Sequence, residues 1–189
     1  MKKINATALV MSLVSASSMA GPTMSVNMSR EHRAIQTIET VFDPTGVDAP
    51  TVRHYTNNDR ANHVGFTVGY DFPSDSALSF STGLTYTMSP TSPLTFEMNA
   101  VYQVTDRIGI KAGLNYSKYL NSGNYREIAA GFQAGVVINT TASTYLDLGF
   151  QRTTQSGFFV TPPTTAGQGT EQHFDDKNDS VQARIGFRF

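Results

Sequence analysis

The sequence predicts an all-β protein, an eight-stranded antiparallel up-and-down barrel that crosses a lipid bilayer. Apolar and polar residues alternate with a period of two through most of the chain after residue 61, which is typical of strands with one apolar face. The alternating segments are about ten residues long, the length that a tilted strand needs to cross a bilayer. No helical apolar run of about 18 residues exists, and a closed barrel is the other structure that satisfies every backbone group in lipid.

The N-terminal segment predicts export. Lys2 and Lys3 precede an apolar stretch at 6–14, and small residues lead to Ala20, after which we expect a signal peptide to be cleaved. The apolar stretch is too short to span a bilayer as a helix. The sequence has no cysteine, which excludes a lipoprotein anchor and any disulfide. We therefore expect a signal peptide at 1–20 and one barrel domain at 21–189.

The region between the cleavage site and residue 61 is expected to hold the first strand. Seven alternating segments follow this region, and single-chain bacterial barrels have an even number of strands, so an eighth strand must precede them. Two stretches within 21–42 qualify, namely 24–29 and 34–42. We favour the first because it directly follows the cleavage site. The remainder, to about residue 61, is expected to be an extracellular loop.

The seven later segments share one design, in which every second residue is apolar. Their apolar faces run through 64–72, 78–88, 94–102, 108–116, 128–138, 146–150 and 181–189. All eight prolines of the chain lie outside these segments, as expected where a strand ladder needs its N–H donors. With the C-terminus on the periplasmic side, the turns at 73–76, 105–107 and 139–143 are short. The longer connections, including one at about 153–179, lie on the other side, which is the asymmetry of bacterial outer-membrane barrels.

Glycines indicate which face points inward. They lie on the polar faces of the segments, as in Gly65, Gly113 and Gly131, and not on the apolar faces. Glycine weakens a strand unless close packing or strong curvature needs it, so we expect a narrow, crowded interior. A soluble sandwich or a lipocalin-like barrel is the alternative, and it would place the large apolar residues inside.

The inward face carries charges of both signs, which persist in a narrow interior only if they are paired. We interpret them as an ion-pair network that plugs the lumen, because an eight-stranded interior is just wide enough for side chains. A charged constriction in a small pore is the alternative. The expected members of the network are Glu97, Lys111, Glu127, Asp147, Arg184 and Arg188.

Two groups of residues are candidates for catalysis or metal binding. His63 faces inward near the outer rim, but Thr85 and Thr87 lie near it in the expected register and no carboxylate is evidently placed to orient its ring. In the last loop, Glu171, His173, Asp175 and Asp176 have the types needed for a metal site or an acid/base pair. The alternative is a solvated loop tip, so we predict no catalytic residue, metal or cofactor.

Charge and loop composition indicate the class of partner. The formal net charge is −1, and loss of Lys2 and Lys3 with the leader makes it about −3, which argues against nucleic-acid binding. A basic group at 53–60, with Arg53, His54, Tyr55 and Arg60, is a candidate contact for lipopolysaccharide phosphates. The apolar residues at 158–160 are a candidate contact for a host or phage surface ligand.

The terminal run Arg184-Ile185-Gly186-Phe187-Arg188-Phe189, the signal peptide and the turn asymmetry together resemble the small outer-membrane β-barrel family, the eight-stranded opacity-like and attachment/invasion-like proteins of porin fold. The resemblance covers the whole mature chain, but only the signal peptide and the terminal Phe are local motifs. It implies assembly by the barrel-insertion machinery, which in that family reads the terminal aromatic strand, here Ile185, Phe187 and Phe189.

The resemblance implies no particular activity, because the same fold hosts adhesins, structural proteins, small channels and lipid-modifying enzymes. Lipid A acyl-modifying barrels use His and Ser on adjacent strands near the outer rim, and this sequence does not visibly show that pair. We therefore expect a monomeric, non-enzymatic barrel of the Gram-negative outer membrane with a structural or surface-interaction role. A small porin is the second interpretation, and an enzyme of the outer leaflet is the third.

Overall fold

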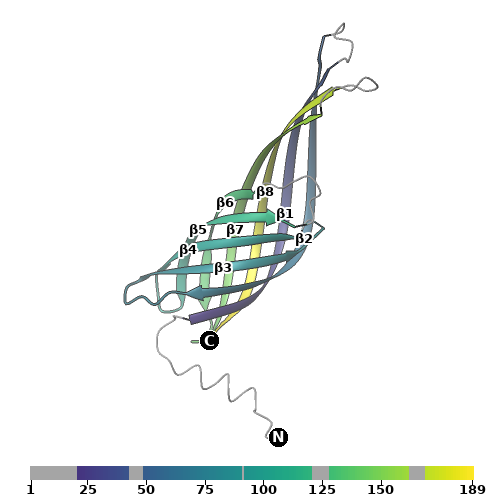
Figure 1. Ribbon diagram of the computed structural model, residues 1–189. Coiled ribbons are helices and arrows are strands. Elements are labelled where there is room, and N and C mark those ends of the chain that lie inside the picture. The colour runs from purple at the N-terminus through teal and green to yellow at the C-terminus, as the bar shows by residue number, and fades with distance from the viewer. Residues whose placement is uncertain (1–20, 43–48, 91, 121–127, 162–168) are drawn as a thin grey trace, which may run out of the picture.

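A computed structural model describes residues 21–42, 49–90, 92–120, 128–161 and 169–189. It contains eight β-strands, shown in Figure 1. Among the described residues there is no helix long and apolar enough to cross a membrane. The strands are β1 (Gly21–Phe42), β2 (Thr51–Asp71), β3 (Leu78–Met88), β4 (Pro93–Gln103), β5 (Ile108–Tyr119), β6 (Ile128–Asn139), β7 (Thr144–Thr161) and β8 (Gly169–Arg188).

The eight strands form one closed ring. Each strand pairs antiparallel with the next in the chain, and β8 pairs with β1 to close the barrel. This seam between the first and last strands runs from the pair of Thr23 and Arg188 to the pair of Phe42 and Gly169. The prediction of an all-β, eight-stranded, up-and-down barrel is confirmed, and both stretches considered for the first strand belong to β1.

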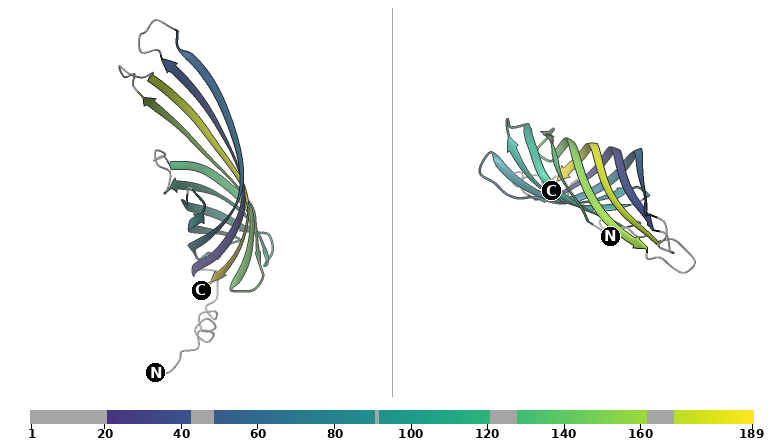
Figure 2. Two further views of the ribbon diagram at one scale, coloured as in Figure 1. Left: turned by 90° about the vertical axis from the view of Figure 1, so that its right-hand side faces the viewer. Right: turned by 90° about the horizontal axis from the view of Figure 1, so that it is seen from above.

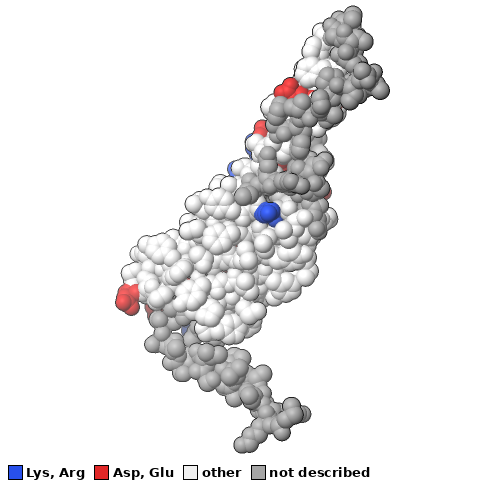
Figure 3. Space-filling view, in the orientation of Figure 1, with Lys and Arg blue, Asp and Glu red and all other residues white. Residues whose placement is uncertain are grey.

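The polarity of the wall is that of a barrel in lipid. Outward-facing apolar side chains are exposed, with Met28 at 66 % and Ile185 at 61 %, whereas inward-facing Asn27 and Thr67 are buried. On the face in Figure 3 the broad wall is almost free of charge, and acidic and basic residues lie near its ends and on the extension above it. The alternative of a soluble barrel with an apolar interior is therefore wrong for this chain.

The interior is crowded, and glycine is required where neighbouring strands approach closely. A Cβ atom at Gly186 of β8 would collide with the ring of Tyr145 on β7. At Gly131 of β6 it would collide with the backbone oxygen of Arg152. Glycine on the inward face thus leaves room for an aromatic ring or a neighbouring strand, as the sequence indicated.

Four strands are much longer than the wall requires. The strands β1, β2, β7 and β8 have 22, 21, 18 and 20 residues, whereas β3 to β6 have 11 or 12. They continue past the barrel as a four-stranded extension, which Figures 1 and 2 show rising from one side of the ring. We define the extension as 31–42, 51–61, 154–161 and 169–179.

The extension corrects two expectations. The extracellular loop expected up to about residue 61 is wrong from Thr51 onward, because β2 begins there and pairs with β1. The loop expected at about 153–179 is largely strand as well, since β7 ends at Thr161 and β8 begins at Gly169. Both faces of these segments are mostly polar, so the sequence pattern that marks a strand in lipid is absent there. The expected signal peptide lies outside the described residues.

Candidate functional site

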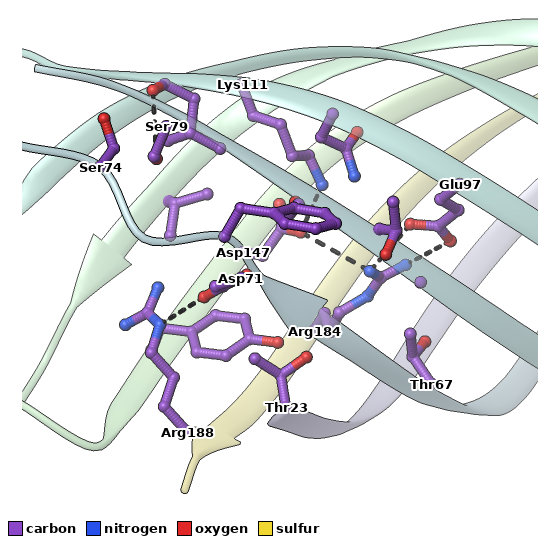
Figure 4. A pocket seen from close by; sticks show the side chains of 18 of the residues that line it. Thr23, Thr67, Asp71, Ser74, Ser79, Glu97, Lys111, Asp147, Arg184 and Arg188 are labelled. Carbon is purple, nitrogen blue, oxygen red and sulfur yellow. Dashed lines mark hydrogen bonds and ion pairs between the residues drawn. The ribbon is translucent and has the colours of Figure 1, made fainter. Parts of the chain in front are cut away.

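A cluster of four charged side chains fills the middle of the lumen (Figure 4). Arg184 of β8 donates from Nη1 to Oε2 of Glu97 on β4 at 3.0 Å and from Nη2 to Oε1 at 2.8 Å. Both residues are buried, Glu97 at 1 % and Arg184 at 5 % exposure. Lys111 of β5 donates to Asp147 of β7, whose Oδ2 lies 4.0 Å from Nη1 of Arg184. We name these four residues the central cluster; its charges balance.

Neutral side chains complete the hydrogen bonding of the central cluster. Thr85 of β3 donates from Oγ1 to Oε1 of Glu97 at 2.7 Å. Gln133 of β6 donates from Nε2 to Oδ1 of Asn99 at 2.6 Å and to Oε2 of Glu97 at 3.3 Å. Because the alternation points these side chains inward from successive strands, residues far apart in the chain meet across the lumen. This network joins six of the eight strands: β3, β4, β6 and β8 meet through Glu97 and its partners, and β5 and β7 are connected through Lys111 and Asp147.

Arg188, an expected member of the network, lies apart from the central cluster. Arg188 donates from Nε to Oδ2 of Asp71 at 2.7 Å and from Nη1 to Oδ1 of Asn139 at 2.9 Å. Its guanidinium carbon also lies 4.6 Å from the centre of the Tyr145 ring. Arg188 therefore forms a separate group at the end of the lumen near the C-terminus, apart from the contacts of Arg184. Glu127 lies outside the described residues.

The lumen contains an open volume on one side of the central cluster. A cavity of about 210 Å³ lies toward the end of the lumen near the C-terminus and is lined by Asp71, Lys111 and Arg184, among others. The pocket on the other side measures only about 40 Å³. Some buried polar atoms at this level have no hydrogen-bond partner in the described protein, namely both amide atoms of Asn115 and Nε of Arg184. Buried polar atoms of proteins are generally hydrogen-bonded, through ordered water where no protein group reaches them.

A second polar cluster, which sequence reasoning missed, lies at the end of the lumen from which the extension rises (Figure 1). Nε2 of His63 on β2 lies 3.1 Å from Oε2 of Glu31 on β1. Asn178 of β8 donates from Nδ2 to Oε1 of the same carboxylate at 2.6 Å. The expectation that no carboxylate is placed to orient His63 is therefore wrong. The signal was available: if the inward alternation of β1 is extended past Ser29, which pairs with His63, the next inward residue is Glu31.

An arginine at the same rim contacts side chains of two other strands. Arg33 of β1 donates from Nε to both oxygens of Asp176 on β8, at 3.0 and 2.8 Å. Its guanidinium carbon lies 5.8 Å from the centre of the Tyr119 ring on β5. We name Glu31, Arg33, His63, Tyr119, Asp176 and Asn178 the rim cluster. Burial raises the pKa of Glu31, although nearby His63 and Arg33 act in the opposite direction.

Comparison with known proteins bears on the fold. No family model and no curated protein matches the chain. Solved structures do match. Ail, the attachment invasion locus protein of Yersinia pestis, matches at 14% identity over 90% of this chain and 100% of that chain, with a TM-score of 0.43. OprG of Pseudomonas aeruginosa matches at 12% identity over 90% and 96% of the two chains, with a TM-score of 0.46. Neisserial surface protein A matches at 14% identity over 85% and 97%, with a TM-score of 0.37.

The chain has the fold of the small outer-membrane β-barrels. Its own strand pairing carries this statement, because eight antiparallel strands close one ring. In this small barrel, Ile185 and Phe187 of the expected assembly signal point outward and are exposed. The backbone N–H of Phe189 donates to the carbonyl of Pro22 at 3.0 Å, so the terminal residue lies at the seam.

The residues expected to form a metal or acid/base group in the last loop are divided between two faces of β8. Asp176 points inward to Arg33, whereas Glu171, His173 and Asp175 alternate onto the outward face. Nε2 of His173 lies 3.7 Å from Oε1 of Glu171. The expectation of one compact group is therefore wrong for Asp176. Within the described ranges, no group of three or more His, Cys, Asp or Glu side chains has the arrangement of a metal site.

The expected basic group at 53–60 is also divided. Arg53 lies on the inward side of β2, where its Nη1 is 4.0 Å from Oε2 of Glu39. Arg60 lies on the outward side, in register with His32 of β1. The two arginines therefore do not form one surface. The side chains at 158–160, expected to be apolar contacts, lie outside what the structure describes.

Proposed function

We propose that the chain is an outer-membrane barrel with a structural or surface-interaction role, whose lumen is closed to solutes. The paired contact of Arg184 with Glu97 carries this proposal, because it spans the lumen with both side chains buried. The rim cluster supports a second closure toward the extracellular side. A carboxylate and a guanidinium paired in this way are stable only while both remain in place, so an open pore would require their separation.

Residence in the outer membrane is supported by the apolar outer wall and by the interior of small and ionic side chains. We propose that the leader at 1–20 directs export and that Ile185, Phe187 and Phe189 are read by the barrel-assembly machinery. Lipid and lipopolysaccharide are then the constant partners of the wall. The extension stands clear of the wall, where a host or phage ligand is able to reach it.

The role is proposed to be non-enzymatic. His63 and Glu31 form a base with an orienting carboxylate, but both face the lumen rather than the lipid. A small porin is the second candidate. The cavity of about 210 Å³ and the unpartnered atoms of Asn115 favour it, because they leave room for water beside the central cluster.

Planar-bilayer recording tests the closed lumen. We expect the folded wild-type protein to give no steady channels, and we expect Lys111→Ala and Arg184→Ala to raise the frequency of conducting events because each removes part of the central cluster. Heat-modifiable gel migration of the same samples reports folding. Steady wild-type channels would overturn the proposal and favour the porin.

A further inference from the structure

The outer wall is hollowed where the seam strands meet. A groove of about 790 Å³ lies over β2, β1, β8 and β7, and its lining is mainly apolar. We name it the seam groove. Within the wall, the strand register aligns Val64, Met28, Ala183 and Leu148 in one row, with Ala183 directly between Met28 and Leu148. Ala183 is the smallest side chain of this row, so it forms the floor between larger neighbours.

One end of the seam groove carries a cation. Arg30 lies in the next row toward the extension, between Asn62 and Val181, and it is exposed. No ion pair of Arg30 occurs among the described residues, whereas nearby Arg152 is held by Asp179 at 2.6 Å. One row further, His32 lies in register with Arg60 on one side and with Asp179 on the other, and Asp179 is paired with Arg152. The groove is thus apolar along its length, and Arg30 is the cation at its outer end.

We propose that the seam groove binds one acyl chain of a phosphate-bearing lipid of the outer leaflet, with the phosphate at Arg30. This inference rests on the proposed residence in the outer membrane. The guanidinium donates to phosphate oxygens in a fork, which suits one negative group at the membrane surface. An acyl chain that leaves the surrounding lipid gains little from the hydrophobic effect. Its binding to the groove therefore depends on van der Waals packing against Met28, Ala183 and Leu148.

The form of the groove favours an amphiphile over other occupants. A free phosphate would contact Arg30 and leave the apolar part unused. The volume of the groove falls in the range of about 300 to 1,000 Å³ that small-molecule sites occupy. A lipid with a charged head and a hydrocarbon chain matches both ends at once.

The chain supplies matched controls on the opposite side of the barrel. Ala112 of β5 is an outward-facing alanine in register with Ala100 and Ala134, away from the seam. Lys118 of β5 is an exposed outward-facing cation near the extracellular end of its strand. Ala112→Leu and Lys118→Gln therefore change the same chemistry without touching the seam groove.

Native mass spectrometry of the folded protein in detergent, titrated with bisphosphorylated lipid A, tests the inference. Ala183→Leu fills the floor of the groove and Arg30→Gln removes the charge at its end. We expect each to weaken lipid A binding about tenfold, whereas the two control variants stay within about twofold of the wild type. Dephosphorylated lipid A is expected to bind the wild type about tenfold more weakly.

Several outcomes would overturn the inference. Unchanged binding by Ala183→Leu excludes the groove, and equal binding of dephosphorylated lipid A excludes the phosphate. Displacement of lipid A by inorganic phosphate alone indicates a simple anion site. If the wild-type protein is a dimer and Ala183→Leu makes it a monomer, a second copy of the chain occupies the groove. Heat-modifiable gel migration tests folding, and fractionation with the outer membrane tests localisation, both independently of lipid A binding. If the wild type folds and fractionates as expected but binds no lipid A, the lipid site is refuted and the proposed function is not.

Discussion

The two sides of the ring differ in what sets the length of their strands. The strands β3 to β6 have 11 or 12 residues, close to the span of the bilayer. The strands β1 and β2 have 22 and 21 residues and continue well beyond it. Within the wall, the short and the long strands show the same alternation of outward apolar and inward polar residues. Beyond the wall, the long strands are held by pairing with one another, and lipid no longer specifies which side chains they carry.

The two regions also differ in how their polar groups are held. In the lumen, Glu97 and Arg184 are almost completely buried, so each depends on the other. In the extension, β2 is exposed on both faces over 51–60. Its contacts there are of the surface kind, such as the 3.2 Å hydrogen bond from Tyr55 to Glu39. We therefore expect the barrel to respond strongly to the loss of one charge and the extension to respond weakly and locally.

The largest effect is expected from Glu97→Ala. It leaves the guanidinium of Arg184 buried without its main partner, which costs about 3 to 5 kcal/mol of unfolding free energy. Reversible urea unfolding in lipid vesicles measures this loss of unfolding free energy. The double variant Glu97→Leu with Arg184→Leu serves as control, because removing both charges should restore most of the loss. An unfolding free energy unchanged in Glu97→Ala would contradict the dependence of the barrel on this pair.

A smaller and local effect is expected from Asp176→Ala. Arg33 loses the carboxylate that it contacts through Nε, but it remains partly exposed and can turn to water. Amide hydrogen exchange in the extension parts of β1 and β8 should become about tenfold faster, with little change in the wall. Asp175→Ala is the matched control on the outward face. Equal acceleration in both variants would show that the rim cluster does not anchor the extension.

The smallest effect is expected from the exposed pair of Arg152 and Asp179. The hydrogen bond from Arg152 lowers the pKa of Asp179. A lowered carboxyl pKa in the folded state stabilises the protein above the unfolded pKa of about 3.9, and this contribution is lost as the pH falls through the folded pKa. In Arg152→Gln, the NMR-detected pKa of Asp179 should rise toward its ordinary value. Because both side chains are exposed, solvent screening keeps this contribution small, so the free energy of unfolding at neutral pH should fall only slightly in Arg152→Gln. A large fall would contradict the surface character of this pair.

The wall was predictable from the sequence because lipid imposes a strict rule on it. Outward residues such as Phe66 and Ile185 must be apolar, and the alternation therefore locates each strand and its inward face. The partner of Arg184 was harder to predict, because Glu97 and Asp147 both point inward. Which of them lies opposite Arg184 depends on the register of all the strands around the ring. The extension escaped prediction because water accepts polar residues on either face of a strand. His63 was assigned no partner for the same reason, as its carboxylate comes from that part of β1.

The pairing of β8 with β1 bears on how the chain reaches its folded state. Arg33 and Asp176, which meet there, are 143 positions apart in the sequence. Contacts of such long range close late and make folding slow, and until they form, the edges of both strands stay open to aggregation. We therefore expect these edges to need protection from other chains until β8 pairs with β1.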